Sequence, residues 1–312
     1  MRTWPIRALT ALAALVLAGA AGRAVAAASG PASAAGPAAG AQAAEGPESP
    51  TMGQRRPGRI QMGPAPGQGG EKPVEPADAL PPAPPGKAWK LAWHDEFDGT
   101  ELDPSKWETP PDRPRRNGWW MKKAVGLDGK GHLVIRTFKD GDRYVDGCAR
   151  THGRFEHAFG YYVARIRLQK QPGHWSAFWM FGSGVGRVGD GGRDGTEIDI
   201  MEKPWLDDRV QHTLHWDGYG KDHKSEGKVV QAPGVMEGFH TFALWWTPEE
   251  YVFSIDGRET WRTKAGGVCQ VPLYLKLSDE VGPWGGDIKK AALPDEFLVD
   301  YVRVYDLVDA PR

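Results

Sequence analysis

The sequence predicts an all-β domain, a sandwich or jelly roll built from many short antiparallel strands. Three observations lead to this prediction. Apolar and polar residues alternate with a period of two in several short runs, and Gly, Asp and Pro separate those runs at close spacing. Long helical periodicity is absent. No internal repeat of about 20–50 residues is visible, which argues against a propeller or a solenoid.

The predicted strands lie at 132–138, 158–168, 176–182, 196–202, 210–217, 240–247, 251–257, 273–278 and 297–306. The alternation is clearest in "YYVARIRL", where one face is apolar and Arg165 and Arg167 lie on the other. The apolar face consists of Tyr162, Ala164, Ile166 and Leu168. Many short strands of this kind are typical of a sandwich or jelly roll.

The first part of the chain is expected to lie outside this domain. Arg2 and Arg7 precede an apolar run that is followed by small residues, which is the layout of a cleaved signal peptide over 1–26. The alternative is a membrane anchor, but the apolar run is short for a span. Residues 27–86 are rich in Ala, Pro and Gly and lack periodicity, so we expect a disordered linker. The folded domain would then span 87–312, in a secreted or periplasmic protein.

Charge and cysteine content narrow the range of partners. The formal net charge is −1 and no basic stripe is present, which argues against nucleic acid as a partner. We expect a monomer with no membrane span after signal cleavage. Cys148 and Cys269 could pair in an exported protein or remain buried thiols.

One predicted strand carries three carboxylates. The stretch "GTEIDIMEKP" places Glu197, Asp199 and Glu202 among apolar residues. In a regular strand, residues 197 and 199 share a face and residue 202 points to the other one. One extra residue, inserted as a β-bulge around Ile200–Met201, would bring all three acids to one face and leave Ile198 pointing into the core.

Three acids on one face repel one another, and nothing basic alternates with them in the strand. This cost is understandable if the acids act in catalysis, because two carboxyls about 5–5.5 Å apart suit a retaining glycosidase. The repulsion should raise at least one pKa, as a general acid needs. The alternatives are a calcium site, which would normally draw its ligands from a loop, and a polar edge strand, which would not interleave Ile with every acid.

The acidic strand resembles the active-site signature of glycoside hydrolase family 16, E-x-D-x-x-E. Further likenesses follow in the expected order, in "WHDEFDGTELDPSKWE", "GHLVIRT", "FGYYVARIRL", "GHWSAFWMFG", "HTFALWWTPEEYVFSIDG" and "FLVDYVRVY", and together they cover essentially 87–308. The resemblance implies a concanavalin-like β-jelly roll of two antiparallel sheets with a concave substrate cleft. The strand that includes Met201 resembles the laminarinase, agarase and carrageenase branches, whereas the lichenase branch lacks that residue.

The resemblance also implies roles for particular residues. Glu197 would be the nucleophile, Asp199 the assisting acid and Glu202 the acid/base, while His215 would lie near the leaving-group side. Family members commonly bind one calcium ion on the convex face, for which the candidates are Glu96, Gly131 and Asp300. No cofactor is expected to be required for catalysis.

The 14 tryptophans suit a polysaccharide, because the apolar C–H faces of sugars stack on indoles. Core packing is the preferred interpretation for Trp107, Trp245 and Trp261. In the family, the equivalent of Trp175 stacks in a sugar subsite. The candidate substrate-binding residues are Trp175, Trp179, His215, Trp119, Trp120, Arg116, Asn117, Trp205 and Trp284.

The expected function is that of a secreted, endo-acting, retaining glycosidase on β-linked polysaccharide, with a β-1,3-type glucan as the first candidate. Basic residues near the cleft could bind sulfate or carboxylate groups, or could be solvated loop charges; they are Arg187, Arg193, Lys203 and Lys221. An algal galactan (agarose, porphyran or carrageenan) is therefore an alternative substrate. The same fold could also serve a transglycosylase or a lectin-like binding module, although such a module should have lost at least one acid.

Overall fold

The computed structural model describes residues 80–311, all of which belong to one compact unit. The predicted signal peptide and the predicted linker up to residue 79 lie outside the described residues. The strands are β1 (Lys87–Asp95), β2 (Arg113–Arg115), β3 (Gly118–Trp120), β4 (Val125–Leu127), β5 (Leu133–Asp140), β6 (Arg143–Asp146), β7 (Cys148–Arg150), β8 (Glu156–His157), β9 (Gly160–Arg167), β10 (His174–Phe181), β11 (Glu197–Lys203), β12 (Arg209–Trp216), β13 (Lys224–Gln231), β14 (His240–Trp246), β15 (Tyr251–Ile255), β16 (Arg258–Thr263), β17 (Leu273–Val281) and β18 (Asp295–Asp309). Short 3₁₀ helices lie between them, namely η1 (Lys122–Ala124), η2 (Ser183–Gly186), η3 (Ala265–Gly267), η4 (Pro283–Gly285) and η5 (Ile288–Lys290).

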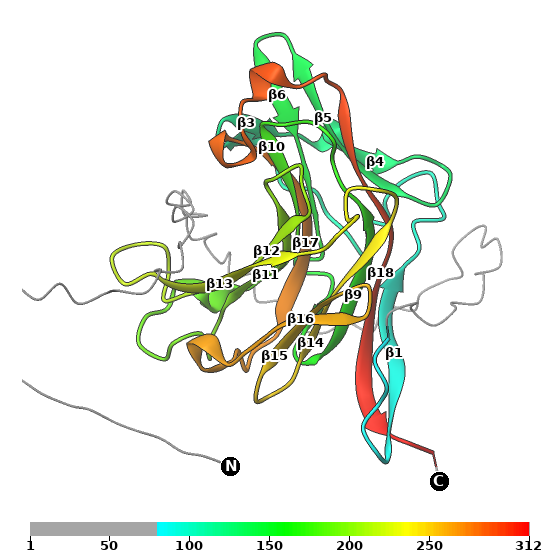
Figure 1. Ribbon diagram of the computed structural model, residues 1–312, viewed down its shortest axis with the longest axis vertical. Coiled ribbons are helices and arrows are strands. Elements are labelled where there is room, and N and C mark those ends of the chain that lie inside the picture. Colours follow the sequence, from blue (N-terminus) through cyan, green and yellow to red (C-terminus); the bar gives the residue numbers. More distant parts are fainter. Residues whose placement is uncertain (1–79, 312) are drawn as a thin grey trace, which may run out of the picture. The chain divides into compact units, whose positions relative to one another are not determined.

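Two sheets face each other, as Figure 1 shows. The first, here called the β18 sheet, has the order β16-β15-β14-β9-β18-β5-β6-β3-β2, with β1 paired to β18 and β4 to β5. The second, the β11 sheet, has the order β13-β12-β11-β10-β17-β7, with β8 paired to β17. Among the described strands, every pairing is antiparallel except β3 with β6. The predicted sandwich of two antiparallel sheets is therefore confirmed, with one parallel pair as an exception.

The main hydrophobic core combines side chains from both sheets. Tyr162, Ala164 and Ile166 on β9 are fully buried in it, as the alternation predicted. Their neighbours Tyr161 and Val163 point to the opposite face of β9, where a second apolar cluster forms. Full burial of one large apolar side chain contributes about 1.5–3 kcal/mol, so this two-sided burial makes β9 a central stabilising strand.

All nine predicted strands are present, with boundaries that shift by a few residues. The missed strands are short or lie at an edge. Strand β13, for example, is an edge strand with seven of its eight residues exposed, so it has no apolar alternation to detect. Trp107 and Trp261 belong to the main core, as predicted, and Trp245 packs against the second apolar cluster.

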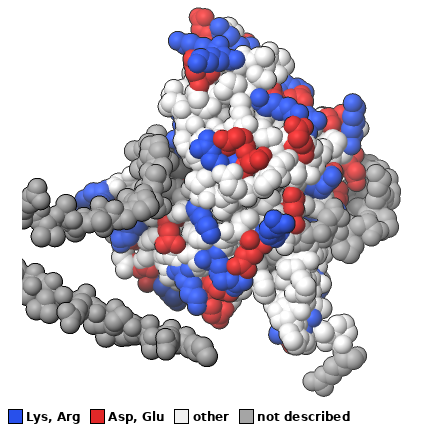
Figure 2. Space-filling model, in the orientation of Figure 1, with Lys and Arg blue, Asp and Glu red and all other residues white. Residues whose placement is uncertain are grey.

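Two further features concern the expected export and membrane topology. Cys148 and Cys269 are both buried and do not form a disulfide with each other. No helix within residues 80–311 has the length and apolarity that a membrane crossing requires. Lysine, arginine and acidic residues are interspersed on the face drawn in Figure 2, which agrees with the absence of a basic stripe in the sequence.

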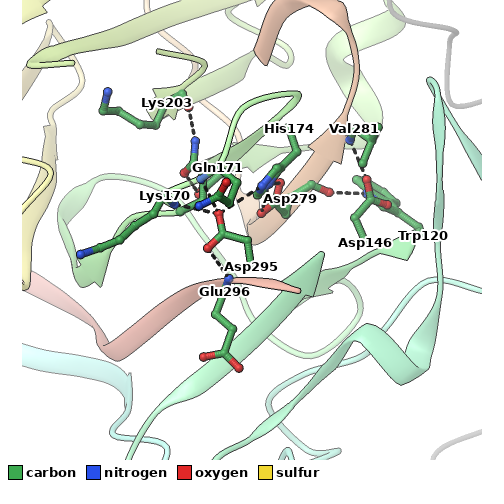
Figure 3. A network of polar contacts seen from close by, with 12 residues as sticks. Trp120, Asp146, Lys170, Gln171, His174, Lys203, Asp279, Val281, Asp295 and Glu296 are labelled. Carbon is green, nitrogen blue, oxygen red and sulfur yellow. Dashed lines mark hydrogen bonds and ion pairs between the residues drawn. The ribbon is translucent and has the colours of Figure 1, made fainter. Parts of the chain in front are cut away.

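A buried polar network ties the ends of β10 and β17 to the start of β18 (Figure 3). The His174 imidazole lies between two carboxylates, with Nδ1 2.8 Å from Asp279 Oδ1 and Nε2 3.2 Å from Asp295 Oδ2. Asp295 also accepts hydrogen bonds from the backbone N–H groups of Lys170 and Gln171. Burial favours the neutral imidazole, but the two carboxylates prevail and raise the pKa of His174 to about 10.

We expect His174→Gln to destabilise the domain at pH 6 by roughly 3–5 kcal/mol, because the buried Asp279 and the partly buried Asp295 lose their cation. The folded-state pKa of about 10 lies above the ordinary value of 6.5. The contribution of His174 is therefore complete below about pH 6.5 and is lost as the pH rises through about 10. Urea unfolding should show that the difference between wild type and variant shrinks between pH 6 and pH 10. A difference that stays constant over this range would contradict the assignment.

Candidate active site

Strand β11 contains a β-bulge where the sequence predicts one. The three-residue step from Asp199 to Glu202 lies opposite a two-residue step on β12, from Thr213 to Gln211. The register of β11 against β10 shifts at the same place. Because directly opposed residues of an antiparallel pair share a face, the extra residue brings Glu202 to the face that carries Glu197 and Asp199.

The core side of the bulge is fixed by apolar packing and by one histidine. Ile198, Ile200 and Met201 are fully buried, which confirms the predicted inward direction of Ile198. His212 Nδ1 lies 2.7 Å from the carbonyl oxygen of Ile200. A carbonyl only accepts hydrogen bonds, so Nδ1 carries the proton, and burial lowers the pKa of His212 to about 4. His212 is therefore a neutral donor that holds the bulged backbone in place.

The three carboxyl groups are crowded and largely removed from water. Glu197 is 1% exposed and Asp199 is 3% exposed, while Glu202 is partly exposed. Burial, together with repulsion from Glu202 and Glu197, holds the pKa of Asp199 well above its usual range. Burial and the charge of Glu197 raise the pKa of Glu202 to about 8, against opposing effects of Arg116 and the Trp175 indole. Asp199 and Glu202 therefore hold protons near neutral pH, which suits a general acid.

The strand β12 and the loop that follows it complete the surroundings of the acids. The Tyr219 hydroxyl donates a hydrogen bond to Glu197 Oε2. His215 Nε2 lies 3.4 Å from Asp199 Oδ2, and His215 Nδ1 lies 2.9 Å from His223 Nε2. The structure thus places His215 beside the acids. Sequence reasoning missed Tyr219 and His223, because they belong to the loop "DGYGKDH", where the only signal was closeness in sequence to His215.

The predicted tryptophans of β10 lie on the face of the acids, but their rings are covered. Trp179 pairs with Asp199 across the strands, and Trp175 lies on the same face because strand side chains alternate. Trp175 is 2% exposed and Trp179 is 4% exposed. The guanidinium of Arg116 lies 5.0 Å from the ring centroid of Trp175, and Lys276 Nζ lies 3.6 Å from that of Trp179. Neither ring offers an open face to a sugar, which corrects the expectation of direct stacking.

The two tryptophans of β3 differ in their surroundings. Trp120 is 1% exposed and its indole N–H donates to the Asp279 carbonyl at 3.0 Å, so Trp120 is a core residue and not a loop platform. Trp119 is partly exposed, and the Arg143 guanidinium lies 4.1 Å from its ring centroid. Of this pair, only Trp119 remains accessible to a substrate.

An open part of the predicted sugar-binding surface lies next to the covered Trp175. Trp284 meets Trp175 edge-on at 5.3 Å between centroids and meets Trp205 edge-on at 6.1 Å. Trp205 and Trp284 are partly exposed and line a hollow of about 340 Å³. The structure therefore brings three of the predicted tryptophans together and leaves two of them accessible.

The turn between β2 and β3 supplies two arginines to one buried carboxylate. Arg115 Nη2 lies 2.8 Å from Glu280 Oε1, and Arg116 Nε donates to Glu280 Oε2. Burial opposes ionisation of Glu280, but the two guanidinium groups prevail and lower its pKa. Glu280 lies opposite Trp175 in the sheet. Sequence reasoning named Arg116 and its exposed neighbour Asn117 but missed Arg115 and Glu280, because the contact joins distant parts of the chain.

The basic residues expected near the cleft do not form one anion site. Lys203 is fully buried, and its Nζ donates to the backbone carbonyls of Trp205 and Asp207. Burial lowers the pKa of Lys203 to about 8. Its hydrogen bonds to two loop carbonyls show that Lys203 supports this loop. Arg193 donates to the Gly267 carbonyl at 3.3 Å. The remaining two basic residues, Arg187 and Lys221, are exposed and lie in loops.

Two sets of residues bear on metal binding. Among the described residues, one carboxylate oxygen each of Glu197 and Asp199 and one nitrogen of His215 lie within 4.8 Å of one another. This spacing also suits proton exchange, and the Tyr219 hydroxyl already bonds to Glu197, so we interpret the group as catalytic.

The predicted calcium ligands do not fit a cation site well. Both carboxylate oxygens of Glu96 accept hydrogen bonds from Arg303, at 2.9 Å each. Asp300 forms an ion pair with Arg165. A guanidinium beside each carboxylate neutralises the charge that would attract calcium. Calcium binding through Glu96, Gly131 and Asp300 therefore stays a prediction from the resemblance, without support from these side chains.

Comparison with known proteins gives consistent matches. Residues 117–303 match the model for glycosyl hydrolases family 16. A β-glucanase from Rhodothermus marinus is 29% identical over 250 residues, and the match covers 71% of this chain and 86% of the relative. A keratan-sulfate endo-1,4-β-galactosidase from Sphingobacterium multivorum is 28% identical over 239 residues, and the match covers 70% of this chain and 56% of that relative.

Solved structures agree with this match. The laminarinase catalytic domain from Thermotoga maritima superposes with a TM-score of 0.60 at 28% identity, over 70% of this chain and 98% of that domain. The matched family region includes β10, β11 and β12, the strands that build the site. On its fold, its bulged acidic strand and these matches, the chain belongs to glycosyl hydrolases family 16.

Proposed function

We propose that this chain is a secreted, retaining endo-glycosidase that hydrolyses β-linked polysaccharide. One observation carries the proposal, namely that the bulge in β11 gathers three carboxyl groups on one face, two of them buried and one partly exposed. Such an arrangement is costly in an ordinary strand and useful in glycoside hydrolysis. Family membership and the β-glucanase and laminarinase relatives support it.

The first step is a displacement at the anomeric carbon. The Glu197 carboxylate attacks this carbon while Glu202 gives its proton to the departing glycosidic oxygen, which leaves as a sugar hydroxyl. A glycosyl ester on Glu197 results. The Tyr219 hydroxyl positions the attacking carboxylate through its hydrogen bond. Asp199 stays protonated between the two and limits the negative charge of the site.

The second step returns the enzyme to its starting state. Glu202, now a carboxylate, takes a proton from water, and the water oxygen attacks the anomeric carbon. The ester bond to Glu197 breaks, so the product keeps the starting anomeric configuration. A sugar hydroxyl in place of water would give transglycosylation. A lectin-like module is the less favoured proposal, because all three acids are present and two of them hold protons.

The first candidate substrate is a β-1,3-type glucan, on the strength of the glucanase and laminarinase relatives. A galactan is the second, which the similarity to a keratan-sulfate endo-β-galactosidase supports. The panel that decides between them is laminarin, lichenan, agarose, porphyran, κ-carrageenan, keratan sulfate and xyloglucan, with release of reducing sugar as the readout. Release of oligosaccharides of several lengths would support endo action. Binding to a polymer without any release would favour the lectin-like alternative.

Variants of Glu197 and Glu202 should distinguish the role of the nucleophile from the role of the acid/base. Glu202→Gln should lower kcat/KM on polysaccharide by roughly 10²–10⁴-fold, because the leaving oxygen loses its acid. The same variant should keep most of its first-step rate on a dinitrophenyl glycoside, whose leaving group needs no proton. Glu197→Gln should lose activity on both substrates. Glu259→Gln, an exposed glutamate paired with Arg262 on the other sheet, serves as the control. Equal losses of first-step rate by both variants on the dinitrophenyl glycoside would contradict these roles.

The pH profile of kcat/KM should fall as the pH rises through about 8, because Glu202 must be protonated to act as the acid and its pKa is raised to about 8. On the dinitrophenyl glycoside this alkaline fall should be absent, since no acid is needed. The measurement is the rate against pH for both substrates. An identical alkaline limb for the two would assign it to another group.

Tyr219→Phe should lower kcat/KM by roughly 10–100-fold, since a hydrogen bond to a charged group contributes about 1.5–3 kcal/mol. The variant keeps the ring, so thermal unfolding should change little. Steady-state kinetics on the best polymer of the panel checks the prediction. Wild-type rates in a correctly folded Tyr219→Phe would show that this hydroxyl does not position the nucleophile.

A further inference from the structure

Several tryptophans around the cleft have a lysine or arginine cation in contact with the indole ring. The contacts, measured to ring centroids, are Arg143 on Trp119 at 4.1 Å, Arg115 on Trp120 at 4.7 Å, Arg116 on Trp175 at 5.0 Å, Lys276 on Trp179 at 3.6 Å and Arg209 on Trp205 at 4.5 Å. Two of these five cations are buried in the scaffold, since Lys276 is fully buried and the buried Arg115 pairs with Glu280. Arg116 is the arginine of this set whose charge acts on Glu202.

Arg116 lies at the turn between β2 and β3 with a φ of 49°, a left-handed backbone conformation that is uncommon for a residue other than glycine. This conformation directs its side chain over the ring of Trp175. Its Nε donates to Glu280, and its two terminal nitrogens make no hydrogen bond with any described residue. The side chain is 20% exposed. Arg116 therefore presents unused N–H donors to solvent beside the acids.

Further groups pack against the same ring next to Arg116. A Cβ atom added at Gly282 would lie 3.1 Å from the Trp175 ring, so the backbone is packed against the indole. Trp284 meets the same ring edge-on. With Arg116 on the ring and 2% exposure, Trp175 has no apolar surface for a sugar. A sugar at this position meets a guanidinium.

Apart from the Glu197 carboxylate, the charged groups next to Arg116 have a positive balance. One carboxylate, Glu280, stands against two guanidinium groups, Arg115 and Arg116, so the balance of the three is +1 (two positive charges minus one negative charge). Glu202 next to them holds its proton below about pH 8 and adds little negative charge. A guanidinium binds carboxylate and sulfate through two parallel hydrogen bonds, which a neutral hydroxyl cannot match.

We propose that Arg116 makes the subsite beside Glu202 selective for a sugar that carries an anionic substituent, a carboxylate or a sulfate. The inference rests on the proposed glycosidase function and refines its substrate class. A neutral β-glycan would still reach the acids, but it would leave the guanidinium without a partner. The preferred substrate is thus an acidic β-linked polysaccharide.

The test compares polymers that share a backbone and differ in charge. The pairs are β-1,3-glucan against its carboxymethyl and sulfated forms, and desulfated against native keratan sulfate. For at least one pair, the wild type should show higher kcat/KM on the charged member at low ionic strength, and the advantage should shrink at 1 M salt. Arg116→Gln should lower the charged-to-neutral ratio about tenfold. The ratio cancels any general effect of Arg116 on the acids.

Arg136→Gln is the matched control, because Arg136 is an exposed arginine in an ion pair with Glu296 on the other sheet. It should leave the ratio unchanged. A wild-type ratio near one in every pair, or an equal loss on both members in Arg116→Gln, would overturn the inference. Affinity electrophoresis in gels with the same polymers reads the charge preference without turnover. Charge-selective binding that depends on Arg116, with no hydrolysis of any polymer, would keep the inference and reject the glycosidase proposal.

Discussion

The repulsion among three carboxyl groups on one largely buried face of β11 is the constraint around which the site is built. The bulge brings Glu202 to the face of Glu197 and Asp199, and the neutral His212 fixes the bulged backbone from the core side. Like charges this close cannot all ionise, so protons are retained among them. The repulsion that would destabilise an ordinary strand thereby supplies a proton donor, because it contributes to the pKa of about 8 for Glu202.

The surrounding strands compensate for this crowding with fixed donors and cations. Tyr219 donates to Glu197 from a loop, and the buried charge of Glu280 is balanced by two arginines. The network around His174 joins the ends of β10 and β17, the strands that carry Trp175 and Glu280, to the opposite sheet. The position of the covered ring and its arginine is thus tied to the scaffold. Selectivity for charge and stability of the sandwich depend on the same strand ends.

The sequence was sufficient to predict features that depend on residues close together in the chain. Alternation along single strands predicted the two sheets and the inward side chains of β9, and a parity argument within six residues predicted the bulge that aligns Glu202. It was insufficient where contacts join distant segments. The number of tryptophans could not show that Trp175 is covered by Arg116. The course of an irregular loop, which brings Tyr219 to Glu197, leaves no period in the sequence.

In the proposed mechanism, Glu197 bonds covalently to the sugar, and every later step depends on this bond. The direct measurement is mass spectrometry after incubation with a 2-deoxy-2-fluoro glycoside that carries a dinitrophenyl leaving group, since the fluorine slows release of the ester more than its formation. We predict that one glycosyl group is added to the protein, on the peptide that contains Glu197, and that none is added to Glu197→Gln. A label on Glu202 instead, or products of inverted configuration with no label, would contradict it.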